Sequence, residues 1–208
     1  MKTDQLLDAK GFACPMPIVK TKKVMKDINA GEVLEVQATD KGSKADLEAW
    51  AKSTGHQYLG LIEEGEVLKH YLRKSSDQDA VERSYETVAS NEDLQAKMNA
   101  SEDITILDVR EAAEYAFNHI PGAVSIPMGE LESRLQELQK ESAIYVVCRT
   151  GNRSDMAAQT LAANGFTNVT NIVPGMSEWK GNTESTTKIA GSLRRIPNRR
   201  ESTCQSMQ

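Results

Sequence analysis

The sequence predicts an α/β protein with two domains in a chain of 208 residues. The first domain is expected to be a two-layer βαβαββ sandwich, in which two helices cover a mixed sheet. The second is expected to be a parallel sheet with helices on both faces. Three observations predict this: strand and helix patterns alternate along residues 1–74, they alternate again along residues 85–181, and the polar residues 75–84 between them are typical of a linker.

The elements of the first domain follow from apolar spacing. Residues 32–38 alternate as a half-buried strand, while Ile18, Val24 and Ile28 recur at helical spacing. In order, we expect a strand at 5–9, a helix at 18–28, a strand at 32–38, a helix capped by Ser43 or Asp46 that ends near Ala51, and a hairpin of strands at 58–62 and 66–72.

Cys14 opens a Cys-Pro-Met-Pro motif directly before the first expected helix. Because proline is favoured in a first helical turn, Cys14 is expected at or just before the helix N-terminus. The helix dipole, together with Lys20 and Lys23, should favour the thiolate form of Cys14. This lysine-rich stretch is either a solvated helix face or a docking surface for an acidic partner.

The second domain is organised around the loop Cys-Arg-Thr-Gly-Asn-Arg, from Cys148 to Arg153. A buried strand is expected at 143–147 and an amphipathic helix at 154–163. Cys148 therefore lies at the carboxyl end of a strand, where parallel sheets bind ligands, and where helix amides favour an anion. Two arginines and a glycine favour a reactive thiolate over a buried core cysteine. Other expected elements are strands at 85–88 and 104–107 and helices at 90–98 and 130–140.

Four motifs of the second domain resemble the rhodanese family of sulfurtransferases over residues 85–181. They are Leu-Asp-Val-Arg-Glu from Leu107 (followed by Glu114 and Tyr115), His-Ile-Pro-Gly-Ala from His119, the Cys148 loop, and Pro-Gly-Met-Ser-Glu-Trp from Pro174. One departure is Asn118, where the family usually has glycine; we expect asparagine to tolerate a left-handed backbone there. The resemblance implies that Cys148 holds sulfur as a persulfide. Related phosphatases carry one more residue in the loop, so this spacing favours sulfur over phosphate.

The first domain, over about residues 4–74, resembles the TusA-like (SirA-like) small sulfur carriers in its element order and its Cys-Pro-Met-Pro motif. This resemblance implies that Cys14 also carries sulfur as a persulfide. Together the two resemblances imply a rhodanese-type sulfurtransferase. It would take sulfane sulfur from thiosulfate or a low-molecular-weight persulfide and pass it to a thiol or protein acceptor, with Cys14 as the expected one. Transfer within one chain and transfer between the chains of a homodimer both remain open.

Each site residue has an expected role. Cys148 and Cys14 are the catalytic residues, and backbone amides of residues 149–153 stabilise the anion. Arg149 points outward and attracts anionic donors, while Arg153 holds the loop, with Asp108 as its expected partner. Arg110 lines the entrance, although Asp108 and Arg110 could equally form a structural salt bridge. The full set of expected donor-binding residues is Arg149, Thr150, Gly151, Asn152, Arg153, Asp108 and Arg110.

Two alternatives stay open, a non-catalytic sulfur-delivery or docking module and a cysteine-dependent phosphatase or arsenate reductase. Three dispersed cysteines and three histidines without ligand spacing predict no disulfide scaffold, no metal and no cofactor. Residues 89–181 hold 7 basic and 13 acidic side chains, a net charge of −6, which argues against nucleic acid as a direct ligand. We expect a cytoplasmic protein without a membrane segment, with a disordered tail at 182–208 in which Cys204 is incidental.

Overall fold

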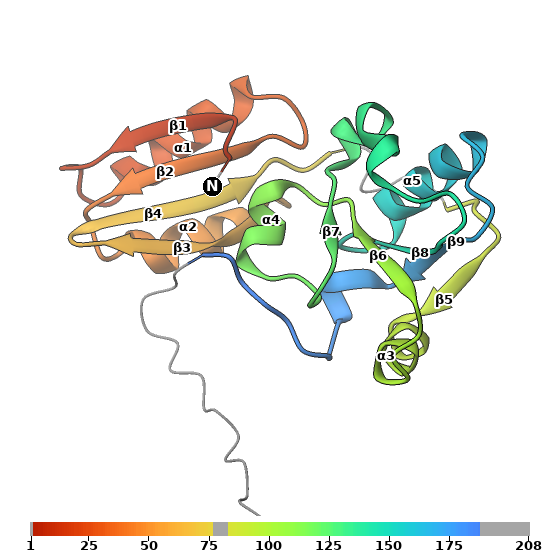
Figure 1. The fold of residues 1–208 in the computed structure, drawn as a ribbon. Helices are drawn as coiled ribbons and strands as arrows, with labels where there is room; N and C mark the ends of the chain where they lie inside the picture. Colours follow the sequence, from red (N-terminus) through yellow and green to blue (C-terminus); the bar gives the residue numbers. More distant parts are fainter. Residues whose placement is uncertain (1, 77–82, 188–208) are drawn as a thin grey trace, which may run out of the picture.

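The structure, a computed structural model, describes residues 2–76 and 83–187. Figure 1 shows two α/β domains side by side, with the first domain in red to yellow and the second in green to blue. Most of the expected linker and most of the expected tail, including Cys204, lie outside the described residues. Within the described residues, no helix is both long and apolar enough to cross a bilayer.

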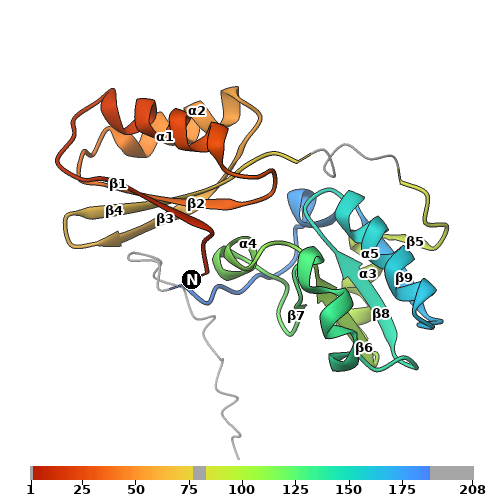
Figure 2. The same ribbon diagram turned by 90° about the horizontal axis from the view of Figure 1, so that it is seen from above.

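The first domain has the predicted βαβαββ order. Its sheet runs β1-β2-β4-β3, with β1 and β2 parallel and the other neighbours antiparallel. Both helices cover one face of this sheet (Figure 2), so the expected mixed two-layer sandwich is confirmed. The elements are β1 (Gln5–Ala9), α1 (Met16–Asp27), β2 (Val33–Ala38), α2 (Ser43–Ser53), β3 (Gln57–Glu64) and β4 (Val67–Arg73).

A small apolar core joins the two layers of the first domain. Leu34 and Leu72 lie on neighbouring strands and face the helices, where Met25 of α1 and Leu47 of α2 meet them. All four side chains are buried, because the helices present apolar residues to the sheet at helical spacing. Val19 lies on the opposite side of α1 and stays exposed.

His70 is a buried polar residue in this domain, and both of its ring nitrogens form hydrogen bonds. The Ser43 hydroxyl donates to the Asp40 carbonyl at 2.6 Å, so Ser43 Oγ accepts from His70 Nε2 at 2.9 Å. His70 Nδ1 then accepts from the Tyr58 hydroxyl at 2.8 Å. Burial, assisted by Lys44, lowers the pKa of His70 to about 4. The Ser43 side chain takes part in these hydrogen bonds and does not cap α2. The helix begins without any side-chain cap.

The second domain is a five-stranded parallel sheet in the order β5-β9-β8-β6-β7. Strands alternate with helices along the chain, as predicted. The elements are β5 (Val88–Ser90), α3 (Asn91–Asn99), β6 (Ile104–Asp108), α4 (Ala112–Phe117), β7 (Val124–Ser125), the 3-10 helices η2 (Met128–Glu130) and η3 (Glu132–Glu137), β8 (Ala143–Val147), α5 (Asn152–Ala163), β9 (Val169–Val173) and the 3-10 helix η4 (Gly175–Glu178).

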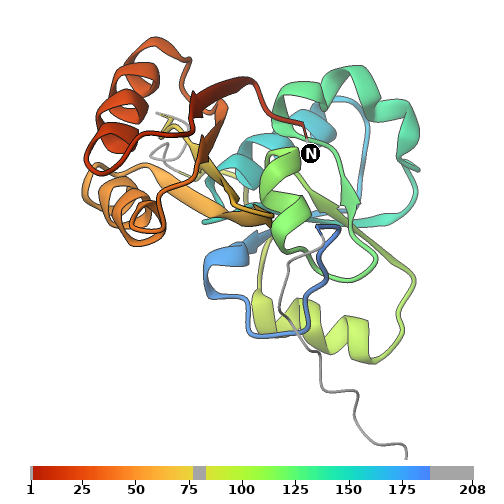
Figure 3. The ribbon, with the colours of Figure 1, turned by 90° about the vertical axis from the view of Figure 1, so that its left-hand side faces the viewer.

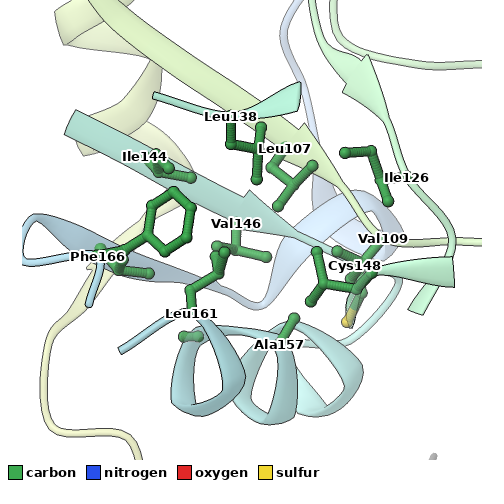
Figure 4. Packing of buried hydrophobic residues seen from close by; sticks show 13 residues of the cluster. Leu107, Val109, Ile126, Leu138, Ile144, Val146, Cys148, Ala157, Leu161 and Phe166 are labelled. Carbon is green, nitrogen blue, oxygen red and sulfur yellow. The ribbon is translucent and has the colours of Figure 1, made fainter. Parts of the chain in front are cut away.

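Alternate residues of the central strand β8 face opposite layers. Ile144 and Val146 pack in one apolar cluster with Leu161 of α5 (Figure 4), whereas Tyr145 belongs to a second cluster with Leu94 of α3. Because side chains of a strand alternate between faces, the sheet is covered on both sides. The expected parallel α/β domain is therefore confirmed.

Two local expectations for the second domain differ from the structure. The helix expected at 130–140 is a pair of 3-10 helices, which still bring Leu131, Leu135 and Leu138 to the core. Both helix types satisfy that apolar spacing, so the pattern does not distinguish them. The first strand begins at Val88, three residues later than expected.

The expected disorder of the tail is wrong for its first residues. Residues 182–187 pack on α4, and Glu184 exchanges two backbone hydrogen bonds with His119 at 2.8 and 2.9 Å. Thr186 also donates its backbone N–H to the Ala116 carbonyl at 3.0 Å. These backbone bonds form without apolar side chains, so hydrophobic periodicity could not reveal them.

The two domains meet where α4 packs against β3, at an edge visible in Figure 3. Gly60 has φ +153° at an irregularity of β3, and a Cβ there would lie 2.5 Å from the Phe117 ring. Phe117 also meets Tyr71 edge to face, with 5.4 Å between ring centroids. Only glycine at position 60 lets the Phe117 ring approach this closely. We call this contact between β3 and α4, together with the neighbouring residues Gln57, Arg73 and Glu114, the seam.

The neutral buried His70 predicts acid sensitivity of the first domain. In the unfolded chain His70 would titrate at its ordinary pKa of 6.5, whereas in the fold it titrates at about 4. The unfolded state therefore binds more protons, and the free energy of unfolding should fall as the pH drops from about 6.5 to about 4.

Urea unfolding across that pH range measures this effect, with His70→Gln as the reference. Glutamine keeps hydrogen-bonding capacity but cannot titrate, so the variant should show a flatter pH dependence than the native chain. His56, whose pKa is also lowered by burial, remains in both proteins and cancels. Parallel curves for the two proteins would contradict the assignment of a neutral His70.

Candidate active site at the Cys148 loop

Cys148 follows β8 directly and precedes the N-terminus of α5. Its sulfur accepts a hydrogen bond from the Gly151 backbone N–H at 3.1 Å and one from the Ser154 hydroxyl at 3.3 Å. Figure 4 shows Cys148 at the edge of the apolar cluster, with its sulfur on the side of α5. The side chain is only 1% exposed, so polar donors at a helix N-terminus surround a sulfur atom largely shielded from water.

The loop needs glycine at position 151. Gly151 has φ +95°, and a Cβ there would lie 2.9 Å from Val173 Cγ2 and 3.2 Å from Arg83 Nη1. Both the left-handed backbone and this crowding exclude a side chain. The conformation turns the Gly151 N–H toward the sulfur, one of the amides of residues 149–153 that were expected to face it.

The Pro-Gly-Met-Ser-Glu-Trp motif supports the loop through backbone contacts. Met176 donates its backbone N–H to the Cys148 carbonyl and Ser177 donates to the Arg149 carbonyl, both at 2.8 Å. A Cβ on Gly175 would lie 2.5 Å from the Cys148 carbonyl oxygen, so this position also requires glycine. The motif was recognised in the sequence, but its role as a clamp on the loop was not.

Two further polar residues at the site were missed by sequence reasoning. Ser154 Oγ lies 2.6 Å from Asn171 Oδ1, and its single proton can go either to that oxygen or to the Cys148 sulfur. Asn171 in turn donates from Nδ2 to the Gly151 carbonyl at 3.1 Å. The available signal was Asn171 itself, an amide between the apolar residues of a strand that the structure shows to be fully buried.

Arg153 holds the loop, but its expected pairing with Asp108 is wrong. Arg153 donates from both terminal nitrogens to the Glu114 carboxylate, at 2.8 and 3.1 Å. Asp108 instead pairs with Arg110, whose Nη2 lies 2.6 Å from Oδ2. The reason is local: Asp108 and Arg110 sit two residues apart at the end of β6, whereas Glu114 on α4 faces the loop.

Glu114 joins the loop to the first domain. Gln57 donates from Nε2 to Oε1 of Glu114 at 3.2 Å, and Arg73 Nε lies 3.7 Å from Oε2. Burial opposes ionisation of this carboxyl, but Arg153, Arg73 and Arg110 outweigh it and hold the pKa at about 2. Glu114 belongs to one of the motifs that resemble the rhodanese family, but no role was predicted for it from the sequence.

The remaining predicted residues line the loop or its approach. Arg149 is exposed, while Thr150 and Asn152 are half-buried. Arg110 lines a cavity of about 170 Å³ at the seam, together with Arg149, although its guanidinium is held by Asp108 and by the Asn118 carbonyl. A left-handed backbone was expected at Asn118, but its φ of −157° is extended, a conformation that any residue adopts.

Cys14 is exposed and lies two residues before α1, at the predicted place. The expectation that its surroundings favour the thiolate is wrong. A hydrogen bond to Asp46 of α2, together with the negative charge of that carboxylate, raises the pKa of the Cys14 thiol. The ammonium of Lys20, one of the two lysines expected to favour the thiolate, sits over the Phe12 ring at 4.0 Å.

Cys14 and the seam lie at opposite ends of the first domain. Cys14 follows the Ala9 end of β1, next to Ala38 of β2, whereas the seam residues Gln57 and Arg73 align with Val33 at the other end. The six residues of β2 span about 20 Å at a rise of about 3.3 Å each. The structure therefore does not bring Cys14 and Cys148 together.

Comparison with known proteins agrees with the description of each of the two domains. Residues 5–74 match the family described as Sulfurtransferase TusA, and residues 90–182 match the Rhodanese-like domain. YrkF of Bacillus subtilis (strain 168), a protein named for sulfur carriage, is 56% identical over 184 residues, which cover 88% of this chain and all of YrkF. The chain belongs to the family that joins a TusA domain to a rhodanese domain.

Shorter relatives match single halves of this TusA–rhodanese protein. The sulfur carrier protein TusA of Allochromatium vinosum is 44% identical over 72 residues, covering 35% of this chain and 95% of that protein. Among solved structures, a rhodanese-like domain protein from Staphylococcus aureus has 31% identity and a TM-score of 0.47, covering 49% of this chain and all of that chain. The two matched families carry and transfer sulfur, so the protein handles sulfur between donors and protein partners.

The side chains that could ligate a metal ion are dispersed over the described chain. Within residues 2–76 and 83–187, no group of three or more His, Cys, Asp or Glu side chains gathers in a way that could hold a metal ion. The polar groups that contact the Cys148 sulfur include the Gly151 amide and the Ser154 hydroxyl, both of them hydrogen-bond donors.

Substitution of Gly151 tests the loop geometry. Gly151→Ala should abolish or strongly reduce the sulfur loading that the rhodanese resemblance implies for Cys148, because the added Cβ collides with Val173 and moves the amide. Gly122→Ala is a matched control, since Gly122 also has a positive φ, +78°, but has open space around the Cβ position. Loading measured by intact mass should fall only in the first variant, and equal losses would mean that backbone strain alone is responsible.

Substitution of Glu114 tests the buried ion pairs. Glu114→Gln should lower the free energy of unfolding by about 3–5 kcal/mol, because Arg153 and Arg73 lose a buried counter-charge. The contribution of Glu114 is fully present above about pH 4.5, its ordinary pKa, and is lost as the pH falls toward about 2.

Urea unfolding at neutral pH provides the measurement, with Glu137→Gln as the control. Glu137 also pairs with an arginine, Arg134, but on the exposed surface, so its loss should hardly move the midpoint. Similar midpoints for both variants would show that the buried pairs contribute no more than a surface pair.

Proposed function

We propose that this protein is a rhodanese-type sulfurtransferase that loads sulfur on Cys148 and relays it to Cys14. The observation that carries this proposal is the Cys148 sulfur at the N-terminus of α5, within hydrogen-bonding distance of the Gly151 amide and the Ser154 hydroxyl. Hydrogen-bond donors placed in this way stabilise the negative charge of a bound persulfide.

Loading is a displacement at sulfur that needs no additional oxidant. The Cys148 thiolate attacks the sulfane sulfur of thiosulfate and forms a new S–S bond. The original S–S bond breaks, and sulfite leaves with the electron pair. With a low-molecular-weight persulfide as donor, the leaving group is the thiolate of that molecule. The exposed Arg149 would attract either anionic donor toward the loop.

Handover to Cys14 requires a change in the arrangement of the domains or a second chain. In the structure, Cys148 is buried on the rhodanese side of the seam, whereas Cys14 lies at the far end of the TusA sheet. The raised pKa of the Cys14 thiol leaves less thiolate at neutral pH than the sequence suggested. A base or partner that relieves the contact with Asp46 would therefore accelerate the handover.

Cysteine variants of the full chain test this relay. After brief exposure to thiosulfate, Cys148→Ser should show no added sulfur by intact mass spectrometry, because the accepting thiolate is gone. Cys14→Ser should still load Cys148, but it should fail to deliver sulfur to a protein acceptor. Identical behaviour of the two variants would show that the relay order is wrong.

A mixture of the two variants separates the two routes. If sulfur passes between chains, the Cys148→Ser chain should acquire sulfur on its Cys14 from loaded Cys14→Ser chains. Retention of all sulfur on the donor chains would exclude transfer between chains, so that Cys14 of the native chain could receive sulfur only from Cys148 of the same chain. Sulfur on Cys14 but never on Cys148 would instead favour the non-catalytic delivery module.

A further inference from the structure

Two adjoining cavities lie at the seam next to the Cys148 loop, and Arg149 of that loop lines both of them. The inner one, of about 170 Å³, is lined by Met176 and Ser177, which hold the Cys148 loop. The outer one, of about 370 Å³, is formed almost entirely by the TusA domain. Both are lined by Gln57, Tyr58 and Arg149. Together they reach the size of small-molecule sites, about 300–1,000 Å³.

The outer cavity carries charges of both signs. Lys52 and Glu48 of α2 line it on the TusA side, and Arg149 lines it on the rhodanese side. Within the described part of the chain, none of these three side chains forms an ion pair. The cavity therefore offers cationic groups for a carboxylate and an anionic group for an ammonium.

Two further groups add hydrogen-bonding capacity. Gln57 Oε1 is buried and has no hydrogen-bond donor among the described residues, although Nε2 of the same amide donates to Glu114. His56 accepts the Ser75 backbone N–H at Nδ1, which leaves its proton on Nε2 in the neutral form. The cavities thus provide an unused acceptor beside the loop and a ring N–H donor in the outer part.

We propose that the seam is the binding site for an amino-acid or short-peptide persulfide, with the TusA domain forming its outer wall. The inference rests on the proposed loading of Cys148. The persulfide group enters the inner cavity, a carboxylate meets Arg149 and Lys52, and an ammonium meets Glu48. Cys148 thiolate attacks the outer sulfur, its new S–S bond replaces that of the donor, and the donor leaves as a thiolate with the electron pair. Thiosulfate, which has neither carboxylate nor ammonium, uses only the inner part.

Loading kinetics of the full chain with three donors test the assignment. The probes are glutathione persulfide, the persulfide of 2-mercaptoethanol, which has neither carboxylate nor ammonium, and thiosulfate. Lys52→Ala and Glu48→Ala should each lower kcat/KM for glutathione persulfide about 3-fold, and the double variant about 10-fold, as expected for exposed charge contacts. Loading from the other two donors should stay unchanged.

Lys44→Ala is the matched control, because Lys44 is on the same helix but lines neither cavity. It should leave loading from all three donors unchanged. If the Lys52 and Glu48 variants load from glutathione persulfide like the Lys44 variant, the seam site is overturned while the loading of Cys148 stands. If the native chain accepts sulfur from none of the donors, the proposed function itself is overturned.

Discussion

One buried carboxylate, that of Glu114, holds together the reactive loop and the contact between the two domains. It accepts both terminal nitrogens of Arg153 from the Cys148 loop, and it lies beside Arg73 and Gln57 of the TusA domain. Its low pKa of about 2 shows that these cations more than offset the cost of burial. One side chain therefore couples the position of the loop, the ionisation of the carboxylate and the contact between the two domains.

The surroundings of the two cysteines differ in burial and in polar contacts, in a way that suits the proposed sulfur relay. Cys148 is shielded from water and faced by an amide and a hydroxyl, which suits the storage of a reactive persulfide. Cys14 is exposed beside a carboxylate, in a place that a protein partner can reach. A shielded loading site and an accessible delivery site would limit the loss of sulfur to small thiols in solution, provided that the relay operates as proposed.

Sequence periodicity predicted the order of elements and the class of both domains, because burial of one face imposes a spacing that can be read along the chain. The Cys148 loop was also predictable, since its residues are contiguous and fold into one turn. Contacts between distant segments were not. Arg153 meets Glu114 and not Asp108, and Cys14 meets Asp46, because such contacts depend on how helices face each other in space. The close approach of Phe117 to Gly60 had no local signal at all.

The glycine at position 60 has a consequence for how this gene fusion can diverge. A free-standing carrier could accept a larger side chain there, subject to its backbone, but in this chain the ring of Phe117 occupies the required space. A larger side chain at position 60 would therefore require a smaller one at position 117, although the two positions belong to different modules. Exchanging either module for a homologue by recombination would succeed only when the incoming partner preserves this complementarity.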